Sequence, residues 1–156
     1  MKLLHTDFKK GEVKLKIENL DDLWYLNQIV EKNDLIKGKT LRKIKLGEET
    51  QRKQKVEKKA VFLLIEAEKV EFSKTSNVLR ISGIIKQGPE DVPLGLHHTF
   101  NVEENTIIAI IKQKWLKFQV DRLKEASKES SSKILICVHD REEAYFALMK
   151  KYGYQL

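Results

Sequence analysis

Apolar and polar residues alternate along most of the first two thirds of the chain. The alternation is clearest at Val13, Leu15 and Ile17, which occupy every second position and predict a strand with one buried face. A turn at Lys9-Lys10-Gly11 separates this strand from residues 2–6, which predicts an opening hairpin. Further strands are expected at residues 35–36, 40–45, 60–72, 78–86, 97–102 and 106–112.

Two segments follow the helical period instead. A cap at Asn19 or Asp21 predicts a helix that ends at Val30 and buries one side against a sheet. Its apolar positions are Leu23, Leu26, Ile29 and Val30, with Trp24 beside them. A second helix is predicted by Leu116, Val120, Leu123 and Ala126. Short strands joined by tight turns favour a mainly β (α+β) fold, a bent sheet or small β-barrel with two packed helices.

The pattern changes after residue 126. Residues 127–133 form a polar, serine-rich segment that we interpret as a linker between domain 1–126 and a second unit at 134–156. The second unit begins with a nearly continuous apolar run at 134–138, which predicts a buried strand. A helix is expected from Arg141 or Glu142 through Tyr152, ended by Gly153. A strand followed by a helix is how an α/β domain begins, so we interpret 134–156 as a truncated central domain.

Positive charge is concentrated in one segment. The formal net charge is +7, and residues 37–59 hold ten basic and three acidic residues, whereas the rest of the chain holds twenty of each. Such a localised excess is typical of a phosphate-binding surface and predicts contact with RNA. A solvated loop made basic for solubility is the alternative. Residues 47–59 contain almost no apolar side chain, so a long exposed hairpin tip or loop is expected there.

Other features bear on compartment and on the mode of recognition. The single cysteine, Cys137, lies in the apolar run at 134–138 and is expected to be a buried thiol in a reducing compartment. The sequence shows neither a signal peptide nor an apolar segment long enough to span a membrane, so a cytoplasmic protein is expected. No aromatic residue lies within 37–59, which favours recognition of the RNA backbone or shape over base stacking.

Histidines and carboxylates are the remaining candidates for chemistry. His97 and His98 are adjacent, so on a strand they point to opposite faces and cannot easily bind one metal. Structural hydrogen bonding is the first interpretation of this pair, and RNA or ligand contact is the second. Glu66 and Glu68 have the period to share a sheet face, but a metal-dependent nuclease needs several converging ligands. A binding module is therefore favoured over an enzyme.

Several strings of residues, in order, resemble the N-terminal domain of the Pelota family. They are Met1-Lys2-Leu3-Leu4, Asn33-Asp34-Leu35-Ile36 running into Thr40-Leu41-Arg42-Lys43-Ile44, Leu79-Arg80-Ile81-Ser82-Gly83, Gly95-Leu96-His97-His98-Thr99-Phe100 and Lys112-Gln113-Lys114-Trp115. The simple, lysine-rich form resembles archaeal members. The resemblance implies an Sm-like β-barrel, followed from Ile134 by the first strand and helix of a release-factor-like central domain.

The resemblance also implies a function. Family members enter the empty A site of stalled ribosomes with a translational GTPase related to elongation factor 1A, and promote subunit dissociation and mRNA surveillance (no-go and non-stop decay). The loop that reaches the decoding centre and mRNA would correspond to the basic segment. The expected RNA- and ribosome-binding residues are Lys39, Arg42, Lys43, Lys45, Arg52, Lys53, Lys55, Lys58, His97 and His98.

Two further hypotheses remain open at this point. The family has also been described as divalent-metal-dependent endoribonucleases, which makes cleavage of stalled mRNA the alternative function, with catalytic and metal-binding residues unassigned. The other is a general Sm-like RNA binder that assembles as a ring. A monomer that does not bind membranes is expected.

Overall fold

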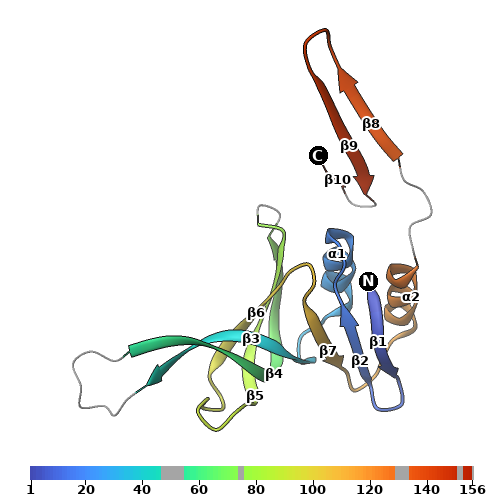
Figure 1. Ribbon diagram of the computed structural model, residues 1–156. Coiled ribbons are helices and arrows are strands. Elements are labelled where there is room, and N and C mark those ends of the chain that lie inside the picture. The colour runs from blue at the N-terminus through green and yellow to red at the C-terminus, as the bar shows by residue number, and fades with distance from the viewer. Residues whose placement is uncertain (47–54, 74–75, 129–133, 151–152, 156) are drawn as a thin grey trace.

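The computed structural model describes residues 1–46, 55–73, 76–128, 134–150 and 153–155 (Figure 1). Ten strands and two helices lie in these ranges. Their order is β1 (Lys2–Asp7), β2 (Glu12–Lys16), α1 (Leu20–Ile29), β3 (Leu35–Leu46), β4 (Lys55–Ser73), β5 (Val78–Gln87), β6 (His97–Val102), β7 (Ile107–Ile111), α2 (Lys117–Ser127), β8 (Ile134–His139), β9 (Ala144–Lys150) and β10 (Gly153–Gln155). The fold is mainly β, as predicted, and no described helix is long and apolar enough to cross a membrane.

Seven strands form one large antiparallel sheet in the order β1-β2-β7-β3-β4-β5-β6. The opening hairpin β1–β2 joins the sheet through β7, which comes much later in the chain. The sheet bends strongly. Strands β4 and β5 lie between β3 and the edge strand β6 in the sheet order, yet a Cβ at Gly38 of β3 would lie only 3.5 Å from the ring of Phe100 in β6. The predicted bent sheet with two helices is therefore confirmed.

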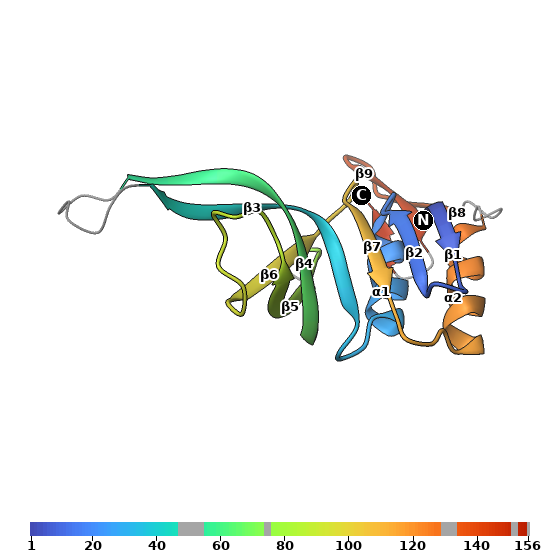
Figure 2. The same ribbon diagram turned by 90° about the horizontal axis from the view of Figure 1, so that it is seen from below.

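Strands β3 and β4 continue beyond the rest of the sheet as a two-stranded ribbon. Pairing of β3 with β7 ends at Gly38, and pairing of β4 with β5 begins at Leu64. Between those limits residues 39–46 and 55–62 pair only with each other, out to Leu46 opposite Lys55. We call this ribbon the arm; Figures 1 and 2 show it projecting away from the two helices. Of the segment 47–59, predicted to be a long exposed hairpin tip or loop, residues 55–59 are strand within the β3–β4 hairpin, and residues 47–54 lie outside the described ranges.

The core lies between the sheet and the two helices. Leu23, Leu26 and Ile29 of α1 are fully buried, as their spacing predicted. Asn19 caps α1 by accepting a hydrogen bond from the Asp22 backbone N–H, and the Asp22 side chain accepts one in return from the Asn19 backbone, a capping box. Alternate residues of β4 and β5 are also buried, among them Ile65 and Ile81.

Asp22 also fixes the start of the chain. The Met1 ammonium is fully buried, 2.8 Å from Asp22 Oδ1, and it donates a second hydrogen bond to the carbonyl oxygen of Ala126. A buried ammonium needs such partners because isolated charges are costly away from water. The contact joins β1 to both helices.

Several residues of the family-like strings hold the large sheet together. Lys112 is buried and donates hydrogen bonds to Asp34 and Glu31. The Trp115 indole donates to the carbonyl oxygen of Gly11 at 2.7 Å. A Cβ at Gly83 would lie 2.0 Å from the backbone oxygen of Glu66, so strands β4 and β5 approach each other here in a way that only glycine allows.

The predicted helix after residue 140 is wrong. Residues 144–150 form strand β9, which pairs antiparallel with β8 on one side and β10 on the other. The Asp140 side chain accepts hydrogen bonds from the backbone N–H groups of Glu142 and Glu143, 2.8 Å each. This Asx turn reverses the chain, so that β9 runs back along β8. Gly153, expected to end a helix, is instead the first residue of β10.

The predicted burial of residues 134–138 is also wrong. Every residue of β8 is exposed, and so is Cys137. Nothing within the described part of the chain packs extensively on this three-stranded sheet, which stands beyond α2 in Figure 1. An apolar strand becomes buried only where another element packs on it, and the apolar residues of 134–138 do not by themselves show that such an element is present.

Candidate nucleic-acid interface

The arm carries most of the basic segment on regular strand backbone. Lys43 and Lys45 belong to β3, and Lys55 and Lys58 belong to β4. Arg52 and Lys53 lie outside the described residues. Because side chains alternate across a strand, the two faces at the root of the arm differ.

One face at the root of the arm is organised around His98. Arg42 Nη1 lies 3.4 Å from His98 Nδ1, and His98 Nε2 lies 3.1 Å from Thr40 Oγ1. A guanidinium can only donate, so the neutral ring accepts at Nδ1 and donates from Nε2 to Thr40. Burial, helped by the nearby Arg42 charge, lowers the pKa of His98. The structural interpretation of His98 is confirmed, because its bonds join β6 to β3.

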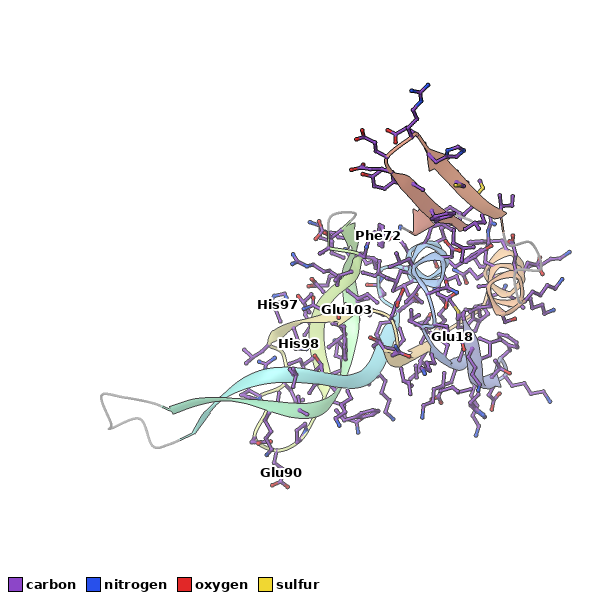
Figure 3. The ribbon with its side chains drawn as sticks, turned by 45° about the horizontal axis from the view of Figure 1, so that its top comes forward. Glu18, Phe72, Glu90, His97, His98 and Glu103 are labelled. Atoms are coloured by element: carbon purple, nitrogen blue, oxygen red, sulfur yellow. The ribbon has the colours of Figure 1, made fainter. Side chains whose placement is uncertain are left out.

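His97 occupies the other face of β6, as the adjacency predicted. Its Nδ1 lies 3.2 Å from Glu68 Oε2, and its side chain is exposed (Figure 3). Glu68 sits at a β-bulge in β4, whereas Glu66 Oε2 contacts the Lys86 ammonium at 2.6 Å. Each carboxylate therefore has its own basic partner.

Histidine and carboxylate side chains do not gather into a cluster within the described residues. No group of three or more His, Cys, Asp or Glu side chains converges within these ranges. Glu66 and Glu68, the acidic pair considered for catalysis, point to separate partners. A metal-assisted cleavage site would need several such ligands around one position.

The second face at the root of the arm combines lysines with exposed apolar groups. Lys39 lies directly opposite Phe62 in the β3–β4 register, and Leu41 lies opposite Ala60. Lys37, one step further along the same face, has its ammonium 5.6 Å from the centre of the Phe62 ring. Phe62 is 55% exposed and Leu41 is 67% exposed. We call these five residues the Phe62 surface.

A groove of about 640 Å³ adjoins this surface. Lys39, Thr40, Leu41 and Ala60 line one side. Thr99 and Asn101 of β6, together with the turn at 103–107, line the other. Glu103, labelled in Figure 3, begins that turn. The groove therefore combines hydroxyl, amide and charged groups with the apolar side chains of Leu41, Ala60 and Ile107, and its volume is within the roughly 300–1,000 Å³ typical of ligand sites.

Phe62 is the residue that the sequence argument missed. It lies three positions beyond the basic segment, and the absence of aromatics within 37–59 pointed away from stacking. The register brings it back beside Lys39. The signal was available in the alternation of β4: because Val61, Leu63 and Ile65 are inward apolar positions, Phe62 had to face out.

A comparison with protein families places this fold. The family model for the Pelota N-terminal domain matches residues 1–127. The chain belongs to the Pelota family. Among curated relatives, the Pelota homologue of Thermococcus onnurineus is 42% identical over 158 aligned residues, covering all of this chain and 44% of that protein. The chain thus spans less than half the length of the relatives it matches.

Solved structures show the same relationship. Ribosome-bound archaeal Pelota, in a structure with ABCE1, matches with a TM-score of 0.71 at 41% identity, over 99% of this chain and 44% of that one. Yeast Dom34, described as a termination-like factor that acts in RNA quality control and interacts with Hbs1, matches with a TM-score of 0.65 over the whole chain and 42% of its own. At 24% identity the likeness to Dom34 is one of fold.

Proposed function

We propose that this chain is the ribosome-contacting part of a ribosome-rescue factor. In this proposal it recognises ribosomes stalled with an empty A site, and so supports subunit dissociation and mRNA surveillance by no-go and non-stop decay. The projecting basic arm carries the proposal, because it is a feature suited to RNA in a chain of the Pelota family. The ribosome-bound state of an archaeal Pelota that is 41% identical supports it.

The geometry of the arm suits a confined RNA target. A strand rises about 3.3 Å per residue, so residues 39–46 extend roughly 25 Å from the sheet. A two-stranded ribbon is also narrow enough to enter a channel that excludes a globular domain. Its lysines and arginines would bind phosphates and release counterions, which gives affinity without sequence preference. In our proposal the arm contacts decoding-centre rRNA and mRNA.

The remaining partners follow from the same proposal. A translational GTPase related to elongation factor 1A would act with this protein, mainly through regions other than residues 1–156. The site of action would be the cytoplasm, and the chain would act as a monomer. No observation on the described residues favours the divalent-metal endonuclease, because Glu66 and Glu68 do not converge. We therefore do not propose cleavage as a second function.

Charge reversal of the arm tests the proposal. The variant carries Lys43→Glu, Lys45→Glu, Lys55→Glu and Lys58→Glu, and leaves Arg42 and its contact with His98 intact. Co-sedimentation with ribosomes stalled on truncated mRNA should show affinity falling by at least about 100-fold near physiological salt. The salt dependence should also flatten, by about 0.7 log units per decade for each phosphate of a single strand that the arm no longer binds.

A matched variant controls for net charge. Lys9, Lys14, Lys32 and Lys117 are exposed and lie outside the arm, and reversing these four changes the net charge equally. This control should bind stalled ribosomes within about threefold of the unmodified chain, because charges far from the bound RNA are screened by salt. If both variants lose the same affinity for stalled ribosomes, the effect is one of net charge and not of the arm, and the proposal is refuted.

A further inference from the structure

Phe62 is a large aromatic residue on the outward face of the arm. It stands on a long strand whose neighbours Val61 and Leu63 are buried, yet 55% of it remains accessible. The adjacent Leu41 is more exposed still. The register places these two large apolar side chains diagonally on the outward face of the arm, where a binding partner could cover them.

The charges around Phe62 indicate what kind of partner fits. The Lys37 ammonium lies 5.6 Å from the ring centre, and Lys39 is the direct cross-strand neighbour of Phe62. Both lysines lie on β3, the strand beside the ring, so they can bind successive phosphates while the exposed ring next to them stacks on a base. Proteins that bind single-stranded RNA combine an aromatic platform with basic side chains in this manner.

The groove beside the surface supplies the polar groups that a nucleotide needs. From Lys39 it runs past Leu41 and Ala60 to Thr99 and Asn101 of β6. Hydroxyl and amide groups can bond to base edges or to a ribose hydroxyl. Glu103 and Glu104 also line the groove. They would repel phosphate, so the RNA backbone would follow the lysine side.

We propose that the Phe62 surface binds one unpaired RNA nucleotide, with its base stacked on Phe62 and its phosphates on Lys37 and Lys39. The adjoining nucleotide of the same RNA would lie in the groove. This inference rests on the proposed function, since it names a second mode of RNA contact at the root of the same arm. It adds base stacking to a segment whose lysines would otherwise bind phosphate alone. The arm would then bind both the backbone and the bases of the RNA.

The test uses a short unstructured oligo(U) RNA and the same RNA with abasic nucleotides. The 156-residue chain should bind the normal RNA roughly tenfold more tightly than the abasic RNA, which keeps every phosphate but has no base to stack. The Phe62→Ala variant should lose about tenfold on the normal RNA and bind both RNAs equally. Its salt dependence should be unchanged, because no charge is removed.

Two variants control the measurement. Phe118→Ala removes another phenylalanine, 50% exposed on α2, and should bind both RNAs as the unmodified chain does. Phe62→Trp keeps a stacking ring and should retain discrimination against the abasic RNA. Discrimination that survives in Phe62→Ala would overturn the inference, as would absence of any oligo(U) binding at low salt.

Ribosome binding separates this inference from the proposed function. If arm charge reversal abolishes ribosome binding while Phe62→Ala leaves oligo(U) affinity unchanged, the stacking surface is wrong and the rescue function stands. If Phe62→Ala weakens ribosome binding but not oligo(U) binding, Phe62 contacts the ribosome in another way and the assignment to an unpaired RNA nucleotide is refuted. If arm reversal leaves ribosome binding intact, the proposed function fails whatever Phe62 does.

Discussion

The large and small sheets of this protein use similar apolar residues in opposite ways. In the large sheet, Leu63 and Ile65 of β4 are completely buried, and β4 contacts helix α1. In the small sheet, Leu135 and Val138 of β8 are more than 60% exposed. Both segments are rich in β-branched and other apolar residues, so composition alone does not decide burial. A second layer does, and only the large sheet has one among the described residues.

The largest expected difference between the sheets concerns stability. Phe100 is buried in the bend of the large sheet, and Phe146 of β9 is 57% exposed. Phe100→Ala should lower the free energy of unfolding by about 3–5 kcal/mol, because it leaves a cavity in the core. Phe146→Ala should lower it by less than about 0.5 kcal/mol. Urea titration followed by circular dichroism measures both, and similar losses would show that the small sheet is covered after all.

A second difference is the buried charge that the large sheet contains. Lys112 is 5% exposed and donates to the carboxylate of Asp34. Lys112→Met should cost roughly 3 kcal/mol at pH 7, since it leaves Asp34 charged and buried without its main partner. Lys114→Met, at an exposed position two residues later, is the matched control and should cost almost nothing.

The pH dependence of that loss has a definite sign. Burial raises the pKa of Asp34 even though the hydrogen bond from Lys112 opposes the shift. A carboxyl with a raised folded pKa favours folding at low pH and loses that contribution as pH rises through the folded pKa. The Lys112→Met penalty should therefore shrink as pH falls through this pKa, where Asp34 becomes neutral. A penalty that grows on acidification would contradict the buried ion pair.

The smallest expected effect concerns Cys137 in the small sheet. Its thiol is exposed, so a thiol reagent should modify the native chain nearly as fast as the urea-denatured chain. Cys137→Ser should change the free energy of unfolding by less than about 0.5 kcal/mol. Strong protection of the native thiol would show that something covers β8.

The difference between the large and small sheets also explains which parts of the fold could be predicted from the sequence. Strict alternation, as at Val13 and Leu15, predicted strands correctly wherever one face meets the helices. Residues 144–150 misled because alanine, leucine, methionine and lysine favour helices. The turn at Asp140 instead returns the chain to pair with β8, and such pairing between segments overrides local propensity.

The charge of the candidate site could be predicted from the sequence, but the residues that come together there could not. The basic excess of 37–59 located the arm from sequence alone, since charge density needs no knowledge of pairing. Phe62 needed the β3–β4 register, because only cross-strand pairing puts it beside Lys39. The bonds of His98 to Arg42 and Thr40 likewise depend on the bend that brings β6 to β3.

The buried ammonium of Met1 has a consequence for the order of folding during synthesis. Its partner carbonyl belongs to Ala126, and β2 pairs with β7, so this end of the sheet contacts segments that are made much later. Contacts so distant in sequence form slowly and only after the intervening chain exists. The β1–β2 hairpin therefore finds its partners in the large sheet only after β7 and α2 have been made, so we expect its attachment to be a late step of folding.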